Sequence, residues 1–599
     1  MATNASAAES ASASPSKWTR WVERLRALVR SSGLALTAMA AVAGVGAGVL
    51  VWLMSRAVQW MHVLLFGLDL NERLSGAAHI ATVRLLLWPT AGGLLVGLSL
   101  WLAARWGRGP AVDPIEANAL RGGRMSFRDS LTVVIQTVLS NGFGGSVGLE
   151  AGYTQAGAGV ASKLGAALRL RRADMRVLVG AGAAGAIAAA FGAPLTGAFY
   201  GFEVVIGAYS VANAAPVMTA AIAGALVAQS IGGSLYHVEA AAPAALRGVD
   251  YALLLPLGAV CAALAIVLML GVSRIERVFQ HPRLAPPLRP ALGGLLVGLM
   301  ALASPQALSA GHGALQYDLA TSQALTVLLG LLALKMLASA VSLGSGFRGG
   351  LFFASLLLGA LAGQAYCQAL SMAGLMAPDP TAAALVGMGA FAVAIVGGPL
   401  TMSFLVLETT GDFALTGAVL AASVLSALIV RETFGYSFST FRFHLRGQSI
   451  RGAHDVGLIR ALTVERLMRR DPPTLSAAAT IGELKTRYPL GSAQRVVLTD
   501  ADGRYAGMVS TVEAHATGRD EDAAASLAKL PDVMLAPSAS VQEAVALFSR
   551  AESEQLAVVD GAVSRKVIGL LDETYAVRRL AEELDRSRQD LIGEPRSEP

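Results

Sequence analysis

The first candidate for chemistry is a glycine-rich turn that leads to Glu150. Residues 142–157 read GFGGSVGLEAGYTQAG, and Gly148 and Leu149 immediately precede the glutamate. A glycine-rich turn that opens a helix presents bare backbone N–H groups, and the helix dipole adds positive potential there. Such a turn can bind an anion without a formal charge. Because the Glu150 carboxylate is itself an anion, we expect it to fill this site when ionised and to vacate it when protonated; the alternative is an ordinary helix cap.

A second turn of this kind lies at residues 345–353, which read SGFRGGLFF. After Arg348 a Gly-Gly pair opens an apolar helix at Leu351 and Phe352, so the same anion-binding device occurs twice. Lys335 stands alone in an apolar stretch between the two turns. It either adds positive potential near an ion pathway, as intramembrane cations often do, or extends to the membrane surface from a helix end.

An internal repeat indicates the elements that position these turns. Residues 182–196 read GAAGAIAAAFGAPLT and residues 387–401 read GMGAFAVAIVGGPLT, and the copies align without a gap. Each copy continues to a glutamate at the same distance beyond its proline, Glu203 in the first and Glu408 in the second. Two matching hydrophobic halves are typical of transporters built from repeats, whose substrate site lies near the membrane midplane between broken helices.

The composition places these halves in a membrane. Of the 599 residues, 54% are hydrophobic and only 15% are charged, and about half of the charges follow residue 450. Residues 1–450 therefore have too little polar surface for a soluble domain. This excludes a disordered chain, a collagen, a secreted disulfide scaffold and a nucleic-acid module as the main identity. Cys261 and Cys367 lie in apolar runs, and their spacing predicts neither a metal nor a redox site.

The charge-free run at 33–54 is long enough to span a bilayer, which favours a membrane helix over a cleaved signal. Basic residues precede this run and follow the last apolar run, so both termini are expected to be cytoplasmic. We predict these regions: a disordered and interfacial amphipathic N-terminus (1–32), a membrane domain (33–446, in halves of about 33–240 and 250–446), a linker (447–460), two small α/β domains (461–520 and 528–585) and a flexible tail (586–599).

The charged C-terminal region also repeats. Each copy combines a polar turn, a helix and two short strands, and the pair resembles cystathionine-β-synthase (CBS) domains, which fold together as one module. Members of that family that bind adenine nucleotides often place an Asp after the last strand, where this chain has Glu513 in one copy and Tyr575 in the other. A weak nucleotide site at Glu513 and a purely structural or dimer-bracing module are both open.

The ordered motifs GLEAG (148–152), GAPLT (192–196), SGFRGGLF (345–352) and GPLT (398–401) resemble the CLC chloride channel and proton-exchanger family. With the CBS-like region, the resemblance covers nearly the whole chain. It implies an all-α polytopic membrane protein with inverted repeats and broken re-entrant helices, and a homodimer with one pore per subunit. It also implies that Glu150 is the gating glutamate and that the backbone amides of Leu351 and Phe352 hold the anion.

Four positions depart from the family pattern. Ala111 replaces the serine of the family's Gly-Ser-Gly-Ile-Pro loop, and the pore tyrosine aligns with Phe438, or with Tyr436 in a shifted register. Leu149 replaces a basic neighbour of the gate. Val204 occupies the place of the inner proton-relay glutamate of the exchangers, so the proton-relay position is lost.

The predicted function is transport of monovalent anions, chloride, nitrate or other halides, through a glutamate-gated pore in a multi-pass protein of the bacterial inner membrane. A passive channel is favoured over an anion/proton antiporter. A CBS-containing divalent-cation transporter would need a carboxylate cage, but its candidates, Asp113, Glu116, Glu203 and Glu408, are scattered. A membrane sensor without transport is the third alternative. No nucleophile–base pair or metal-ligand spacing predicts an enzyme, and we expect no required cofactor and no nucleic-acid partner.

Overall fold

The computed structural model describes residues 32–106, 111–232, 246–445, 462–561 and 563–592. The chain divides into two compact units, Met1–Asp455 and Val456–Pro599. The predicted N-terminal amphipathic segment and the linker at 447–460 lie outside the described residues.

The first unit is helical, and eight of its described helices are long and apolar enough to cross a membrane. The long helices are α2 (Gly33–Phe66), α3 (Thr82–Arg105), α7 (Arg172–Phe191), α9 (Val211–Gly232), α10 (Gly248–Phe279), α13 (Leu325–Ser345), α14 (Phe352–Met372) and α17 (Phe413–Thr433). Shorter helices lie between them: α4 (Pro114–Leu120), α5 (Phe127–Gly142), α6 (Glu150–Ala167), α8 (Pro194–Tyr200) with the π-helical turn η2 (Gly201–Ile206), α11 (Leu288–Ala301), α12 (His312–Ala320), α15 (Pro380–Val396), α16 (Pro399–Thr410) and α18 (Phe438–Leu445).

Small residues allow close contact between helices within each half, at equivalent places in the two halves. In the first half, a Cβ at Gly182 of α7 would lie 2.4 Å from the Gly157 carbonyl oxygen of α6. In the second half, a Cβ at Gly387 of α15 would lie 2.3 Å from the Gly359 carbonyl oxygen of α14. Only glycine permits these approaches, because any Cβ would overlap the facing backbone. In lipid there is no hydrophobic driving force between helices, so close packing of this kind holds them together. Many of the glycines therefore serve helix packing.

The two halves are joined by a reciprocal exchange of glutamates. Glu203, which follows α8, accepts hydrogen bonds from the Leu400 and Thr401 backbone N–H groups at the start of α16, at 3.1 and 2.8 Å. Glu408 on α16 accepts from the Leu195 and Thr196 N–H groups at the start of α8, both at 2.8 Å. Such an exchange requires a two-fold relation between the halves.

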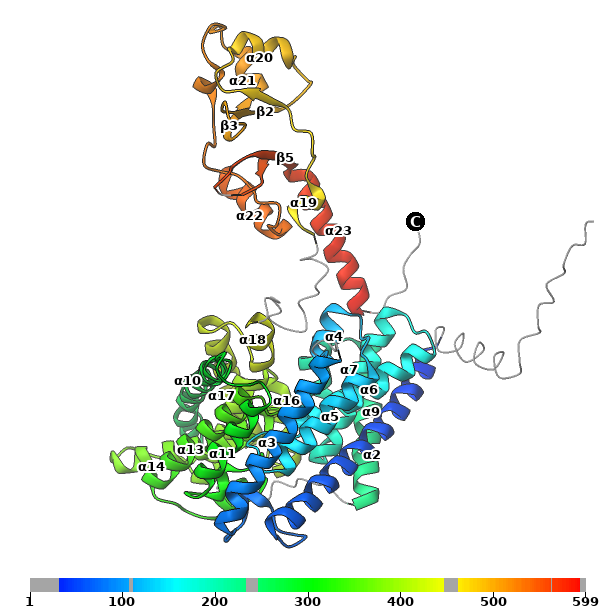
Figure 1. The fold of residues 1–599 in the computed structure, drawn as a ribbon, viewed down its shortest axis with the longest axis vertical. Helices are drawn as coiled ribbons and strands as arrows, with labels where there is room; N and C mark the ends of the chain where they lie inside the picture. The colour runs from blue at the N-terminus through cyan, green and yellow to red at the C-terminus, as the bar shows by residue number, and fades with distance from the viewer. Residues whose placement is uncertain (1–31, 107–110, 233–245, 446–461, 562, 593–599) are drawn as a thin grey trace, which may run out of the picture. The chain divides into compact units, whose positions relative to one another are not determined.

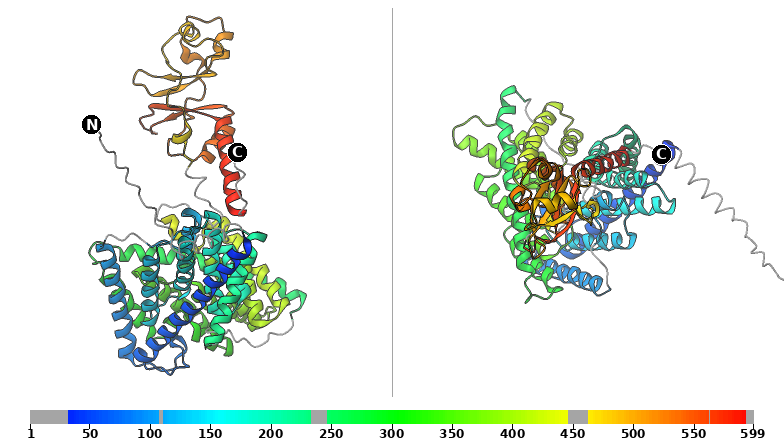
Figure 2. Two further views of the ribbon diagram at one scale, coloured as in Figure 1. Left: turned by 90° about the vertical axis from the view of Figure 1, so that its right-hand side faces the viewer. Right: turned by 90° about the horizontal axis from the view of Figure 1, so that it is seen from above.

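The helices of the two halves lie side by side, coloured blue to cyan and green to yellow (Figures 1 and 2). Helices α7 and α15 end at the repeated motif, where Gly192 and Gly397 have positive φ values of 65° and 90°. Pro194 and Pro399 then start the short helices α8 and α16. The predicted all-α fold of inverted repeats with broken helices is confirmed.

The second unit contains two α/β halves with the elements that the sequence predicted. The first half has β1 (Thr474–Ser476), α20 (Ile481–Arg487), β2 (Arg495–Thr499), β3 (Tyr505–Ser510) and α21 (Thr511–Ala516), and the second has α22 (Val541–Ala551), β4 (Gln555–Val559), β5 (Val567–Asp572) and α23 (Glu573–Ile592). Strand β2 pairs in parallel with β1 and antiparallel with β3, and β4 pairs antiparallel with β5. Val497 and Met508 of the first half form one apolar cluster with Ala557 and Leu570 of the second, so the halves make a single module.

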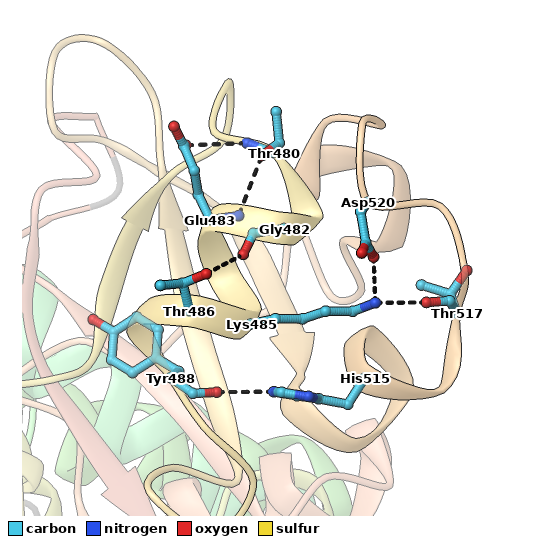
Figure 3. Close-up of polar contacts among 9 residues, drawn as sticks. All are labelled: Thr480, Gly482, Glu483, Lys485, Thr486, Tyr488, His515, Thr517 and Asp520. Atoms are coloured by element: carbon cyan, nitrogen blue, oxygen red, sulfur yellow. Dashed lines mark hydrogen bonds and ion pairs between the residues drawn. The ribbon is translucent and has the colours of Figure 1, made fainter.

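Hydrogen bonds between side chains and backbone fix α20 in the first half (Figure 3). Thr480 and Glu483 form a capping box at its N-terminus. At its other end Lys485 binds the Thr517 carbonyl oxygen at 2.7 Å and pairs with Asp520. These contacts tie α20 to the loop that follows α21.

Two segments cross between the halves predicted at 461–520 and 528–585. Val464 of helix α19 (Val464–Leu467) packs in the core of the second half, and its N–H donates to the Ala539 carbonyl at 2.9 Å. Lys529 exchanges backbone hydrogen bonds with Met508 of the first half. Because a sheet edge needs backbone partners, Lys529 supplies them to β3 of the opposite half.

Helix α23 enters the segment 586–599, which the sequence predicted as a flexible tail. The helix continues to Ile592, because residues 573–592 contain no glycine or proline until Gly593. Ion pairs from Arg578 and Arg579 to Glu582 also support its first turns. Only 593–599 of the predicted tail lie outside the described residues.

Candidate anion site

The N-termini of α6 and α14 meet at the centre of the membrane unit. Gly148 and Gly350 exchange two backbone hydrogen bonds, from Gly148 N–H to the Gly350 carbonyl at 2.8 Å and in return at 3.1 Å. Helix α6 starts two residues later at Glu150, and α14 starts at Phe352. The two glycine-rich turns of the sequence therefore form one junction, where two helix dipoles converge.

Two serines brace this junction in the same way from the two halves. Ser140 Oγ accepts from the Arg348 N–H at 2.9 Å, and Ser342 Oγ accepts from the Ser146 N–H at 2.9 Å. Each serine thus fixes the turn of the opposite half. Neither serine could be predicted from the sequence, because the only signal for them was an equivalent position ahead of each turn.

A cavity of about 150 Å³ lies at this junction. Residues from both halves line it: Ala111, Asp113, Pro114, Ile115, Val133, Thr137, Glu150, Ala151, Thr154, Tyr200, Val204, Arg348, Gly349, Gly350, Leu351, Phe352, Ile395, Val396, Phe438, Ser439 and Arg442. The cavity thus brings together the predicted gate, both predicted amide donors, the alanine that replaces serine and one of the two candidate aromatic residues.

Glu150 lies buried at the edge of the cavity, with 3% of its surface exposed. The backbone N–H groups of Glu150 itself and of Phe353 hydrogen-bond its carboxyl group. Oxygen Oε2 lies against Gly148, where a Cβ would be only 2.0 Å away. The carboxyl group therefore occupies a place shaped by amides of α6 and α14, as an anion would.

The two candidate pore aromatics separate in the structure. Phe438 lines the cavity with Glu150, whereas Tyr436 lines a second cavity of about 200 Å³. Ile115, Val204 and Val396 line both cavities. The second cavity therefore adjoins the first across an apolar wall.

Three hydroxyl groups that the sequence analysis missed line the first cavity. Tyr200 at the end of α8 is half-buried, and its hydroxyl hydrogen-bonds with the Thr154 side chain. Thr154 Oγ1 donates to the Glu150 carbonyl at 3.0 Å, and Thr137 Oγ1 donates to the Val133 carbonyl at 2.8 Å. Nothing in the local sequence marked Tyr200, because its position depends on the packing of α8 against α7 and α16.

The charged groups at the cavity favour an anion. Arg348 and Arg442 line it, and the Arg442 guanidinium lies 5.9 Å from the centre of the Phe438 ring. Asp113 is occupied as the cap of α4, where its Oδ1 accepts from the Ile115 N–H at 2.8 Å. The cavity therefore combines cationic side chains with helix N-termini.

The carboxylates proposed for a cation cage are engaged elsewhere. Glu116 pairs with Arg121 at 3.1 Å, and Glu203 and Glu408 hold helix N-termini. Among the residues that the structure describes, no group of three or more His, Cys, Asp or Glu side chains is placed to hold a metal ion.

Other predicted site residues lie outside the cavity. Gly148 and Leu149 do not line it, and Leu149 is buried in the apolar core. Lys335 is buried behind the junction, with its Nζ donating to the Leu308 and Ser309 carbonyls at 3.3 and 2.7 Å. In the second unit, the Glu513 carboxylate pairs with Lys529.

Sequence comparison gives this geometry a family context. The family model described as "Voltage gated chloride channel" matches residues 92–431. A chloride channel protein, ClcB-like, of Ralstonia nicotianae is 32% identical over 369 residues, which cover 59% of this chain and 85% of that protein. The voltage-gated ClC-type chloride channel ClcB of Escherichia coli is 29% identical over 400 residues, covering 66% and 95%.

Two solved structures share the fold. A slow cyanobacterial Cl⁻/H⁺ antiporter superposes with a TM-score of 0.59 at 21% identity, over 69% of this chain and 97% of its own. A eukaryotic CLC transporter has a TM-score of 0.56 at 19% identity, over 92% of this chain and 98% of its own.

Proposed function

Because the chain belongs to the voltage-gated chloride channel family, whose model matches residues 92–431, we propose that it is a Glu150-gated pore for monovalent anions such as chloride and nitrate. One observation carries this proposal: the Glu150 carboxyl lies where the N-termini of α6 and α14 converge, at the edge of a cavity lined by Leu351 and Phe352.

The proposed gate works by competition. An ionised Glu150 accepts hydrogen bonds from the amides at the junction and excludes a permeating anion from them. A protonated Glu150 binds these donors more weakly, since hydrogen bonds to charged groups are the stronger ones. Acid therefore favours release of the side chain, and an anion can then bind the freed N–H groups together with the Tyr200 hydroxyl.

We favour passive conduction over coupled exchange because Val204 cannot carry a proton. The side chain lines both cavities, between Glu150 and the second cavity. Glu203 lines the second cavity, but its carboxylate already accepts from Leu400 N, Thr401 N and Thr401 Oγ1.

The anion/proton antiporter remains the second candidate. The neighbouring fold described as a Cl⁻/H⁺ antiporter favours it, as does the presence of the Glu203 carboxyl beside the second cavity. In such an exchanger Glu203 would have to leave the N-terminus of α16 to carry a proton. A divalent-cation transporter is not favoured, because the candidate ligands hold helix ends or ion pairs.

Purified protein in liposomes separates the two mechanisms. With a chloride gradient and a membrane potential set by a potassium ionophore, a passive pore reverses at the chloride equilibrium potential and drives no uphill proton movement. Uphill proton movement that Glu150→Ala abolishes would establish exchange instead.

We further propose that the protein is a homodimer in the bacterial inner membrane with both termini in the cytoplasm. The CBS-like unit is proposed to be structural, since Lys529 already pairs with the Glu513 carboxylate that would otherwise hold a ribose. Equilibrium dialysis of the full chain with ATP tests this assignment, and saturable binding that Glu513→Gln abolishes would overturn it.

A further inference from the structure

A small polar cavity lies beside the gate and is separate from the pore cavity. Its volume is about 20 Å³, which is enough for one water molecule or one small ion. The lining residues are Ser55, Val58, Gln59, His62, Arg73, Leu74, Ser75, Asn141, Ser309 and His312. None of these described lining residues is an aspartate or glutamate. The cavity is thus a polar site without a carboxylate inside an apolar unit.

Most of the described lining residues carry polar side chains, and Arg73 is the cationic one among them. Arg73 is held in place by Gln59, whose Oε1 accepts from Nη1 at 3.0 Å while its Nε2 donates to the Leu70 and Glu72 carbonyls. His62 Nε2 lies 3.1 Å from the Asn141 carbonyl oxygen, which can only accept, so this nitrogen carries a hydrogen. One arginine and two histidines, Arg73, His62 and His312, therefore line this cavity.

Lys335 adds a buried cation directly behind the wall. It is 1% exposed, and its Nζ donates to the carbonyl of Ser309, a lining residue, at 2.7 Å. Ser309 adopts a positive φ of 52°, an uncommon conformation for a residue other than glycine. No carboxylate among the described residues forms an ion pair with Lys335. A buried ammonium group is costly unless an opposite charge lies nearby.

Two contacts connect this cavity to Glu150. The His312 ring lies 3.6 Å, centre to centre, from the Phe353 ring, and the Phe353 N–H binds the Glu150 carboxyl. Asn141 Nδ2 donates to the Val147 carbonyl at 2.6 Å, next to Gly148. With the N-terminus of α2 in the cytoplasm, as proposed, His62 near the far end of α2 places the cavity on the outer side of the gate.

We propose that this cavity is a second anion site, which binds one monovalent anion on the outer side of Glu150. The bound ion lies beside Arg73 and near the buried Lys335 ammonium group. The proposal rests on the proposed function for the choice of ion, since the same halides that cross the pore reach this cavity. Its binding is nevertheless measurable without transport.

Anomalous diffraction from bromide tests the site in crystals of the full chain, with Lys335→Met, Arg73→Gln and the control Lys163→Met. Lys163 is an exposed lysine of α6 that lies over the Phe127 ring, away from the cavity. We expect a bromide peak in the wild-type cavity, and in the Lys163→Met variant. Lys335→Met and Arg73→Gln should each lower its occupancy by about half or more while leaving a peak at the pore site unchanged.

Several outcomes would overturn the proposal. One is density for water alone at a bromide concentration that fills the pore site, and another is a peak that neither Arg73→Gln nor Lys335→Met weakens. If Lys335→Met does not fold, the half-exposed Arg73 still provides the test. A peak in this cavity with none in the pore cavity would refute the proposed pore site and leave the second site standing.

Discussion

Replacement of Gly148 by alanine tests whether the position of the Glu150 carboxyl controls the pore. The new Cβ would lie 2.0 Å from Oε2, whereas real Cβ contacts stay above 3.0 Å, so the carboxyl must move by about 1 Å. A carboxyl at the end of a flexible side chain can move at little cost to the fold. Neither Gly148 nor Gly350 has a positive φ, so alanine suits the backbone at both positions.

The displacement should weaken the hydrogen bond from the Phe353 N–H to the carboxyl. A hydrogen bond to a charged group contributes about 1.5–3 kcal/mol. Its loss would favour the open gate by roughly ten- to a hundredfold. We therefore expect Gly148→Ala to raise chloride flux at neutral pH towards its acid-stimulated level.

Chloride efflux from liposomes at pH 7.5 and 4.5 measures this effect. Gly350→Ala is the matched control at the other side of the junction, because its Cβ would make an ordinary 3.4 Å contact with the Ala151 Cβ. The double variant Gly148→Ala/Glu150→Ala should conduct like Glu150→Ala alone, since the affected carboxyl is gone. Wild-type flux and wild-type pH dependence in Gly148→Ala would refute the assignment of Glu150 as the gate.

Three further changes have defined outcomes. Glu150→Gln should conduct with little dependence on pH, because its side chain cannot ionise; unchanged pH dependence of efflux would reduce Glu150 to a helix cap. Tyr200→Phe should lower the preference for chloride over nitrate by about two- to tenfold in bi-ionic reversal potentials, as one hydroxyl donor contributes about 0.5–1.5 kcal/mol; an unchanged ratio would exclude its hydroxyl from the anion site. Glu203→Gln and Glu408→Gln should lower the stability of the purified protein by similar amounts, about 1.5–3 kcal/mol each, in thermal melts that leave the exposed Glu432→Gln control unaffected. A large effect of only one of the pair would contradict the equivalence of their roles.

Residues marked by a motif could be predicted from the sequence. Glycine-rich turns and a helix start identified Glu150, Leu351 and Phe352, because anion binding at a helix N-terminus is a local property of the backbone. The repeated proline motif likewise marked Glu203 and Glu408 as equivalent positions. In the structure both accept hydrogen bonds from the N-terminus of the short helix in the opposite half.

Residues that act only through packing could not be predicted. Tyr200 lines the cavity because α8 packs against α7 and α16, and Ser140 reaches Arg348 across a separation of 208 residues. In the second unit, Val464 packs in the core of the second half. Its position in the sequence had placed it in the first half, predicted at 461–520. In each case the residue that fixes the position lies far away in the chain, and no local sequence pattern indicates that contact.

The reciprocal glutamates have a consequence for synthesis of the protein. The N-terminus of α8 obtains its acceptor only when Glu408 has been made, since Thr196 and Glu408 are 212 residues apart. At roughly 5–20 residues per second, the ribosome needs roughly 10–40 s to cover that distance. During this interval the unpaired N–H groups of Leu195 and Thr196 would cost free energy in lipid. We therefore expect this part of the first half to stay near water or the insertion machinery until then. Synthesis of Glu408 then supplies the acceptor for these N–H groups.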